Sequence, residues 1–296
     1  IGFKHGKRHE GMKLYFIDIR RAYFHAKARR TVFVQLPVED YEEGMCGELE
    51  KAMYGTRDAA QNWEYEYSEF MIEQGFIRGV SSPCVFYHSA KSIRIVVHGD
   101  DFTFLGYPDA LEGILTQMRG WWDVKLRAIM GDEPGDDKEV TILNRKLRWN
   151  SVTLTLTSDE KHVREILKEF DLDDRSKCIS TPADPDGVSK EEDEDLLEGR
   201  EVTRFRAFAA RANYLGQDRC DIQYATKEMS RGMAKPSSGS LKRAKRLARY
   251  LLDFPEGVLK YESECTKLDK LLVYVDSDWA GCKVTRASTS GGVITW

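Results

Sequence analysis

The chain has 296 residues, of which 41% are apolar and 11% aromatic, so it can bury a substantial core and is not intrinsically disordered. Its formal net charge of −4 argues against a strongly basic nucleic-acid-binding protein. Its six cysteines show no C-x-x-C spacing, and it has neither an 18-residue apolar run nor a signal-peptide pattern, which argues against a disulfide framework, a zinc site, a membrane span and secretion.

The first part of the chain predicts apolar strands and two amphipathic helices. Strands are expected at residues 12–19, 31–37 and 84–89 and on both sides of residues 100–101. The first helix is expected over residues 58–74, because apolar side chains recur there at helical spacing, namely Trp63, Tyr67, Phe70 and Met71. The second helix is expected over residues 109–122.

The segment after residue 138 predicts a hairpin followed by a helix. The hairpin covers residues 139–157 and is expected to turn at Asn150–Ser151. Thr157 and Glu160 have the spacing of a capping box, so a helix is expected to begin there and to end at Phe170.

The remaining sequence predicts a linker, three helices and two further strands. A loop is expected at residues 180–187, and the acidic run 190–201 continues it. Together the two segments predict a linker. Helices are expected over residues 201–216, 221–234 and 240–254, and strands within residues 270–281 and 291–296. Because strands and helices do not alternate as βαβ units, the predicted fold class is α+β.

Two adjacent carboxylates, Asp100 and Asp101, interrupt the apolar run SIRIVVHGDDFTFLGY at residues 92–107. Like charges repel and resist removal from water, so a purely structural turn would favour Asn-Gly or Asp-Gly. Asp18 likewise follows the apolar run LYFI. Neighbouring strands that gather these three acids would make a donor set suited to Mg²⁺ and to two-metal phosphoryl transfer. From these residues alone, acids held by hydrogen bonds at strand edges remain the alternative.

The sequence around these carboxylates resembles a known family. FIDIRRAYF at residues 16–24 is similar to the first catalytic motif of reverse transcriptases, and HGDDF at residues 98–102 is similar to the second. Further segments resemble, in family order, the Pol polyprotein of copia-type LTR retrotransposons: VFVQLP, ELEKAMYGTRDAAQNW, CISTP, YLGQDRCDIQYATKEMSR, AKRLARYL and YVDSDWAGCKVTRASTSGGV. By this resemblance we interpret the chain as a Pol fragment that contains reverse transcriptase and the start of RNase H.

The resemblance implies a fold and a division into domains. The expected fold is a palm-type antiparallel sheet with packed helices, then a helical connection region and the first strands of an RNase H-like fold. Residues 1–182 correspond to the reverse transcriptase palm and thumb, with the fingers largely missing. Residues 183–265 correspond to the acidic linker and helical connection, and residues 266–296 to the truncated start of the RNase H domain.

The resemblance also implies which residues form the polymerase site. Asp18 and Asp100 match the principal ligands of two Mg²⁺ ions, for which Mn²⁺ is the alternative. The backbone carbonyl of Ile19 is expected to assist, and Asp101 is the third, less directly bound acid. Tyr23 matches the aromatic residue beneath the incoming sugar, although ordinary core packing would also explain it.

Three further features follow from the resemblance. Asp58 stands near the expected position of the incoming nucleotide, where the family mostly has Gln. Asp276 matches the first metal carboxylate of RNase H, while Asp278 beside it has no assigned role. The helix at residues 240–254 is a candidate nucleic-acid contact, because its basic residues would displace counterions from the backbone: Lys242, Arg243, Lys245, Arg246 and Arg249. A solvated amphipathic face explains this helix equally well.

The implied activity is RNA-directed DNA polymerisation, in which a nucleotide is transferred from a dNTP to a primer 3′ end. The implied partners are an RNA template, a DNA primer or RNA–DNA hybrid, dNTP, and the remainder of the Pol polyprotein with its integrase and full RNase H. No membrane partner is implied. The cysteine usage favours an intracellular protein, and the resemblance implies the cytoplasm, within a virus-like particle, or the nucleus.

Several positions depart from the family pattern. His98-Gly99 replaces the usual Tyr-Val, and Asp58 introduces an anion. Few residues precede Asp18, and the chain stops 20 residues after Asp276, before further RNase H acids. We therefore expect this chain to hydrolyse no RNA and to polymerise weakly. The alternatives are a degenerate, inactive nucleic-acid-binding remnant and, less well supported, a metal-dependent phosphatase or nuclease.

Overall fold

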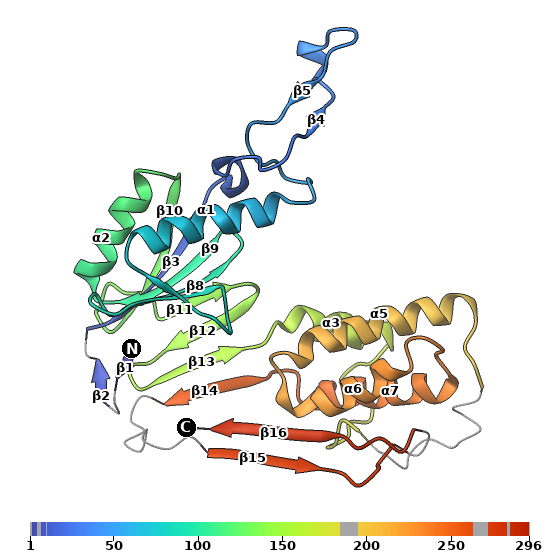
Figure 1. Cartoon of the computed structure of the whole chain (residues 1–296). Helices are drawn as coiled ribbons and strands as arrows, with labels where there is room; N and C mark the ends of the chain where they lie inside the picture. Colours follow the sequence, from blue (N-terminus) through green and yellow to red (C-terminus); the bar gives the residue numbers. More distant parts are fainter. Residues whose placement is uncertain are drawn as a thin grey trace. The chain divides into compact units, whose positions relative to one another are not determined.

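The computed structural model describes residues 2–4, 7–9, 11–183, 195–262, 272–282 and 285–295 (Figure 1). Its contacts divide the chain into two compact units. The first unit contains residues 1–138 and 262–296, and the second contains residues 139–261. The boundaries expected at 182/183 and 265/266 remain predictions from the family resemblance.

The first unit is organised around a six-stranded sheet in the order β10-β3-β9-β8-β7-β6, and every neighbouring pair is antiparallel. Its strands are β3 (Lys13–Ile19), β6 (Ile77–Arg78), β7 (Val85–His88), β8 (Ile93–His98), β9 (Asp101–Gly106) and β10 (Val124–Met130). Two short pairs accompany the sheet: β1 (Gly2–Lys4) with β2 (Lys7–His9), and β4 (Phe33–Val34) with β5 (Gly47–Glu48). The strand predicted at residues 31–37 is therefore mostly irregular chain.

Apolar and polar side chains alternate along the central strands, and this pattern decides which face of the sheet is buried. Tyr15, Ile17 and Ile19 of β3 enter one core together with Phe102 and Phe104 of β9. Helices α1 (Ala59–Glu73) and α2 (Pro108–Arg119) cover this face and confirm the two predicted helices. Successive side chains of a strand point to opposite faces, so the acids that alternate with these core residues lie on the other face of the sheet.

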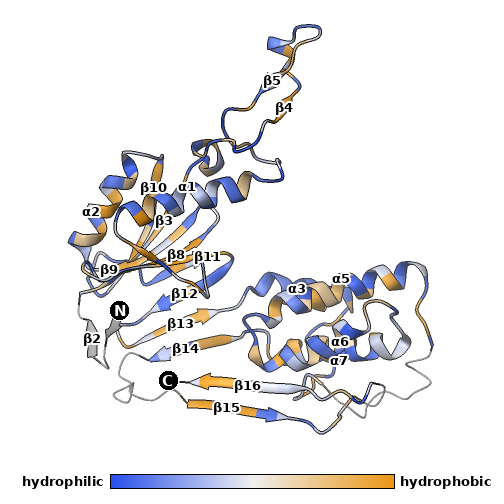
Figure 2. Cartoon of the chain, viewed as in Figure 1, coloured by the Kyte–Doolittle hydropathy of each residue, from blue (hydrophilic) through white to orange (hydrophobic). Residues whose placement is uncertain are grey.

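The covering helices contribute their apolar stripes to the same core. The residues are Trp63, Tyr67, Phe70 and Met71 of α1, and Leu111, Ile114, Leu115 and Met118 of α2. Each set recurs at intervals of three or four positions, which is the spacing of one helix face. Figure 2 shows hydrophobic residues along the strands of the sheet and both hydrophobic and hydrophilic residues along α1.

The second unit joins a four-stranded antiparallel sheet to a group of helices. The strands are β11 (Glu139–Ile142), β12 (Arg145–Trp149), β13 (Thr153–Thr157) and β14 (Val258–Glu262). The helices are α3 (Glu160–Glu169), α5 (Gly199–Gly216), η3 (Cys220–Ile222), α6 (Gln223–Arg231) and α7 (Ser238–Asp253). Val163 and Ile166 of α3 pack into one core with Phe205 and Phe208 of α5 and Leu247 of α7.

Local sequence signals in this unit have different outcomes. The β12–β13 hairpin turns at Asn150–Ser151 as predicted, because Asn150 Oδ1 accepts backbone hydrogen bonds and Ser151 adopts a φ of 69°. The single strand expected over residues 139–149 is wrong, because β11 and β12 pair with each other around a turn at Leu143 and Asn144, which have φ values of 48° and 63°. The capping prediction is wrong: Thr157 ends β13, and Asp159 caps α3 by accepting a hydrogen bond from the backbone N–H of Lys161. A carboxylate at the N-cap satisfies one of the free amides of the first turn.

Strands β15 (Leu272–Ser277) and β16 (Ser290–Thr295) form a two-stranded antiparallel sheet. The α+β class and the antiparallel sheets are thereby confirmed, whereas the RNase H-like character of this last sheet remains a prediction. Among the described residues, no helix combines the length and the apolar composition that crossing a membrane requires.

Candidate active site

Asp18 and Asp101 face each other across strands β3 and β9. The backbone N–H of Ile19 donates to the carbonyl oxygen of Asp100 at 3.0 Å, so the neighbouring Asp18–Asp101 pair is the type without direct hydrogen bonds. Side chains of such pairs approach most closely in an antiparallel sheet. Both carboxyl groups are largely buried, with 16% and 19% of the side chains exposed.

The turn between β8 and β9 carries Asp100. His98 pairs with Asp101, which leaves Gly99 and Asp100 as a two-residue hairpin loop. Gly99 has a φ of +64° and Asp100 has no positive φ, which is the pattern of a type II′ turn with glycine at its first central position. Glycine at this departure from the family pattern thus suits the turn, and Asp100 lies exposed at its tip.

Trp63 of α1 forms a hydrogen bond to this turn from the buried side of the sheet. Its indole Nε1 donates to the carbonyl oxygen of Gly99 at 2.8 Å. The indole is almost fully buried and packs against Trp122, with ring centroids 5.1 Å apart. The helical spacing predicted Trp63 as a core residue, but its bond to the turn of the acids was not predicted.

Arg127 of β10 bridges the two facing acids. Its Nη2 lies 2.6 Å from Asp18 Oδ1, and its Nη1 lies 3.1 Å from Asp101 Oδ1. Sequence reasoning missed this residue. The run VKLRAIM at residues 124–130 has no pattern that links Arg127 to a carboxylate so distant in sequence.

Electrostatics at Asp101 reflect its burial and its neighbours. Partial burial raises the pKa of the Asp101 carboxyl above its usual value, and the charges of Asp100 and Asp18 add to this rise. Arg127 and, more weakly, His98 act in the opposite direction without cancelling it. Asp18 and Asp100 therefore lie close enough to Asp101 to affect its pKa, whereas the role of the three acids as one site remains a prediction.

The donor set can be compared with what a divalent ion needs. Mg²⁺ prefers carboxylate oxygens, and Asp18 and Asp101 already direct one oxygen each at a single cationic group. Within the described ranges, no group of three or more His, Cys, Asp or Glu side chains is gathered for a metal, and Asp100 lies exposed at the turn. The facing pair fits a hard cation, with Asp100 as the adjacent third acid and Ile19 following Asp18 on the buried face.

Tyr23 lies just beyond the end of β3. It belongs to the short helix η1 (Ala22–His25), which begins after Arg21 in a left-handed conformation with φ 53°. The Tyr23 ring is stacked on Tyr54 with centroids 4.3 Å apart and an interplanar angle of 28°. Tyr23 is half-buried against the core, so packing and a role beside a nucleotide both fit its position.

Asp58 is paired with a cation. Its Oδ1 lies 3.0 Å from Arg30 Nη2, and its Oδ2 accepts a hydrogen bond from Asn62 at 3.1 Å. The hydrogen bond from Arg30 lowers the pKa of the Asp58 carboxyl, and burial opposes this shift more weakly. The anion that departs from the family pattern is thus accompanied by its own counter-charge.

The basic residues of α7 are divided between solvent and the protein. Lys242 and Lys245 are exposed, whereas Arg243, Arg246 and Arg249 are half-buried. Arg246 Nη2 donates to Thr181 Oγ1 at 2.6 Å. The nucleic-acid contact of this helix remains a prediction.

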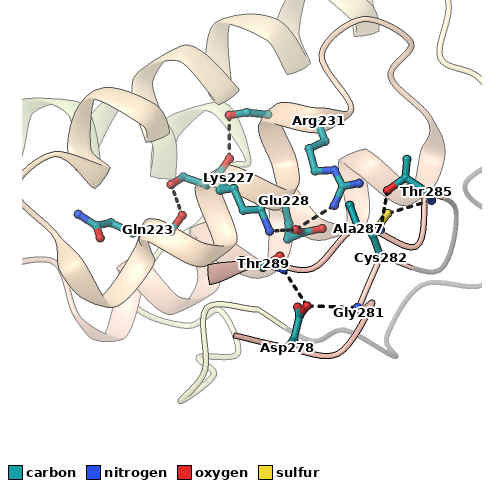
Figure 3. Close-up of polar contacts among 12 residues, drawn as sticks. Gln223, Lys227, Glu228, Arg231, Asp278, Gly281, Cys282, Thr285, Ala287 and Thr289 are labelled. Carbon is teal, nitrogen blue, oxygen red and sulfur yellow. Dashed lines mark hydrogen bonds and ion pairs between the residues drawn. The ribbon is translucent and has the colours of Figure 1, made fainter. Parts of the chain in front are cut away.

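The two acids near β15 differ in their surroundings. Asp276 is exposed and pairs in register with Gly291 of β16. Asp278 Oδ1 accepts hydrogen bonds from the backbone N–H groups of Gly281 at 3.2 Å and Thr289 at 2.7 Å (Figure 3). Asp278 therefore has a structural role in this loop, and the metal role of Asp276 remains a prediction.

Residues 7–182 match the protein family described as Reverse transcriptase (RNA-dependent DNA polymerase). This match covers more than half of the chain, and it includes β3, the β8–β9 hairpin and the facing acids. The chain belongs to the reverse transcriptase family.

Curated relatives extend the likeness over nearly the whole chain. The Retrovirus-related Pol polyprotein from transposon RE1 of Arabidopsis thaliana is 26% identical over 290 residues, which cover 94% of this chain and 18% of the relative. The corresponding protein from transposon TNT 1-94 of Nicotiana tabacum is 25% identical, covering 95% and 22%. The Transposon Ty1-NL2 Gag-Pol polyprotein of Saccharomyces cerevisiae is 24% identical, covering 94% and 16%.

These relatives confirm the resemblance to copia-type Pol polyproteins that the motifs predicted. The chain spans about a fifth of the length of the relatives that it matches. The activities and partners of the whole polyproteins can therefore only be proposed for this chain.

Proposed function

We propose that this chain is the RNA-directed DNA polymerase segment of a copia-type retrotransposon polyprotein. The observation that carries the proposal is the direct pairing of Asp18 with Asp101, beside the turn that presents Asp100. Two facing acids on one face of an antiparallel sheet, with a third at the adjacent turn, are costly in a purely structural role, because their charges repel. A site for divalent metal and phosphates explains why they are kept together.

The roles of the acids follow from their positions. Asp18 and Asp100 would hold two Mg²⁺ ions, or Mn²⁺ in their place, with the Ile19 carbonyl assisting and Asp101 completing the set. When bound, these ions would supply the positive charge that supports attack of the primer 3′ oxygen on the α-phosphorus and departure of pyrophosphate. The sheet holds the acids before substrate arrives, and Trp63 keeps the turn of Asp100 in position.

The nucleotide side of the site is proposed around η1 and the start of α1. Tyr23 would lie beneath the sugar of the incoming dNTP, supported from behind by the stacked ring of Tyr54. Asp58, which begins α1, would lie near the nucleotide with its charge balanced by Arg30. A balanced Asp58 repels a triphosphate less than a lone carboxylate would.

The wider assignment is also proposed. An RNA template, a DNA primer and dNTP are the expected substrates, and integrase and full RNase H are the expected neighbours in a polyprotein. Lys242, Arg243, Lys245, Arg246 and Arg249 of α7 would contact the nucleic-acid backbone, and Asp276 would be the first acid of RNase H. The domain boundaries proposed from the family are 1–182, 183–265 and 266–296.

Primer extension on a homopolymer RNA template tests this proposal. The 296-residue chain and the longest polypeptide encoded in the same frame are compared with Mg²⁺ and radiolabelled dNTP. Incorporation that Asp100→Asn abolishes supports the enzyme. The matched control is Asp40→Asn, which removes the same charge at an exposed position of η2 (Val38–Asp40) and leaves incorporation unchanged.

A second candidate is an inactive nucleic-acid-binding remnant. Two observations favour it: Arg127 lies between the paired acids, and Asp58 replaces the family's usual residue. Binding of the template–primer without incorporation, in either polypeptide, is the outcome that selects the remnant over the polymerase.

A further inference from the structure

Arg127 lies where a cation between the two facing acids would lie. Each Oδ1 atom lies next to a different nitrogen of the guanidinium. The distance is 2.6 Å from Asp18 Oδ1 to Nη2 and 3.1 Å from Asp101 Oδ1 to Nη1. The acids are largely buried, while about half of the Arg127 side chain remains exposed. The bridge therefore joins two partly buried anions through a cation that can still reach solvent.

A β-bulge directs Arg127 toward the acids. In the pairing of β10 with β3, Leu126 lies opposite Ile17 and Ala128 lies opposite Phe16, so Arg127 is the extra, unpaired residue. A bulge bends its strand and re-aims the side chain at the inserted position. By ordinary alternation residue 127 shares the face of Lys125, which pairs with Asp18, so the bulge alters the aim of the Arg127 side chain and the alternation of the residues after it.

Arg127 and a divalent ion would need the same oxygens. A divalent ion held by Asp18 and Asp101 would compete with the guanidinium for the charge of the same two carboxylates. Two cations held by this pair would repel each other strongly at such short range. Binding of one is therefore expected to favour release of the other.

We propose that Arg127 is a built-in counter-cation of the Asp18–Asp101 pair, which holds the acids together without metal and is displaced when a divalent ion binds. The inference rests on the proposed function, because it takes the facing acids as metal ligands. It adds a property of this chain: part of the affinity for metal is spent on releasing an internal ion pair. About half of the Arg127 side chain is already exposed, so the displaced guanidinium has access to solvent.

Direct Mn²⁺ binding to the purified chain tests the proposal, using electron paramagnetic resonance of free Mn²⁺ at a fixed pH. Arg127→Gln removes the competing charge and keeps a polar side chain, so we expect Mn²⁺ to bind at least about tenfold more tightly. Arg127→Lys retains the charge but cannot bridge both acids with two nitrogens. Its affinity for Mn²⁺ is therefore expected to lie between that of the unmodified chain and that of Arg127→Gln.

Arg94→Gln is the matched control. Arg94 lies on β8, on the same face as Asp101, and its guanidinium lies over the Tyr87 ring at 5.1 Å from the centroid. This variant loses the same charge further along the sheet, and its affinity for Mn²⁺ should stay within about twofold of that of the unmodified chain, because salt screens a charge that is partly exposed and further from the acids.

Thermal unfolding supplies a second readout. In chelator, Arg127→Gln leaves the two acids without their shared cation and is expected to unfold at a lower temperature than Arg94→Gln. Added Mn²⁺ is expected to raise the unfolding temperature of Arg127→Gln by more than that of the unmodified chain, since bound ligand stabilises the folded state.

The outcomes separate this inference from the proposed function. If Asp18→Asn loses Mn²⁺ binding but Arg127→Gln binds no more tightly than Arg94→Gln, the counter-cation inference is overturned and the metal site stands. If Asp18→Asn binds Mn²⁺ like the unmodified chain, or if no form binds it, the metal site itself fails and the inference fails with it.

Discussion

The indole Nε1 of Trp63 donates a hydrogen bond to the carbonyl oxygen of Gly99 at 2.8 Å, across a sequence separation of 36 residues. This bond ties helix α1, on the buried side of the sheet, to the turn that carries Asp100. The acids thus depend on a rigid element of the core for their position, as functional side chains generally do.

We predict that Trp63→Phe destabilises the chain by about 2 kcal/mol, because it removes the hydrogen bond to Gly99 and part of a buried ring. Urea unfolding measures the change. The control is Trp121→Phe, since Trp121 is mostly exposed and its truncation should cost less than about 0.5 kcal/mol. Equal effects of the two substitutions would show that the bond to the turn adds no stability.

The turn itself gives a second prediction. Gly99 has a φ of +64°, and a Cβ added there would meet no atom within 4 Å. Gly99→Ala should therefore cost about 1 kcal/mol through backbone strain alone. Gly135→Ala is matched to it, because Gly135 also has open space around it but no positive φ, and it should be neutral or slightly stabilising. A Gly99→Ala variant as stable as Gly135→Ala would contradict the turn type described above.

In the second unit, the buried Arg219 is the central residue of a partly buried polar network. It is 2% exposed, it forms hydrogen bonds to both carboxyl oxygens of Asp221, and it donates to the carbonyl oxygens of Phe254 and Pro255 beyond α7. Arg219→Met removes the shared donor of these acceptors and should cost about 1–3 kcal/mol in urea unfolding.

Arg204→Gln is the control for Arg219→Met. It removes the exposed ion pair of Arg204 with Glu169, which is 2.6 Å long, and it should cost less than about 1 kcal/mol. A loss of under 1 kcal/mol for Arg219→Met would mean that the network is replaceable by apolar packing.

The same network predicts a pH dependence of stability. Burial alone would raise the pKa of the Asp221 carboxyl, but hydrogen bonds from Arg219 and Tyr250 outweigh it, and the net shift is downward. The folded state therefore binds this proton less readily than the unfolded state does. The stabilisation is complete above the ordinary pKa of an aspartate, about 4, and is lost as the pH falls through the lower folded value.

Urea midpoints between pH 7 and pH 2.5 measure this dependence. Asp221→Asn should be less stable than the unmodified chain at pH 7, and the difference should shrink toward the acidic end of the range. A difference that stays constant over the whole range would show that the Asp221 charge does not contribute.

Part of the candidate site could be predicted from the sequence. The apolar run that ends at Asp18 and the doublet Asp100–Asp101 between two apolar runs predicted strands that carry acids, and the pairing of Asp18 with Asp101 realises that expectation. Alternation along a strand is a local property with a period of two, so it decides from neighbouring residues alone which side chains leave the core.

Local sequence patterns could not predict other parts of the fold and of the candidate site. The cap of α3 was predicted at Thr157 from its spacing to Glu160, but Asp159 offers a suitable oxygen two residues later, and only the end of β13 decides between them. Asp58 read as an uncompensated anion, since nothing in the sequence links it to Arg30. In both cases several side chains are chemically suitable, and the tertiary fold selects one.

What the sequence by itself determined is the set of elements, the acids that interrupt them, and the membership of the reverse transcriptase family. What only the tertiary structure decided is which partners those acids have. Arg127 reaches Asp18 across 109 residues of sequence, because the pairing of β10 with β3 places the two strands side by side and a bulge at residue 127 aims its side chain. Contacts of this kind depend on register and packing between distant segments, which composition and periodicity do not encode.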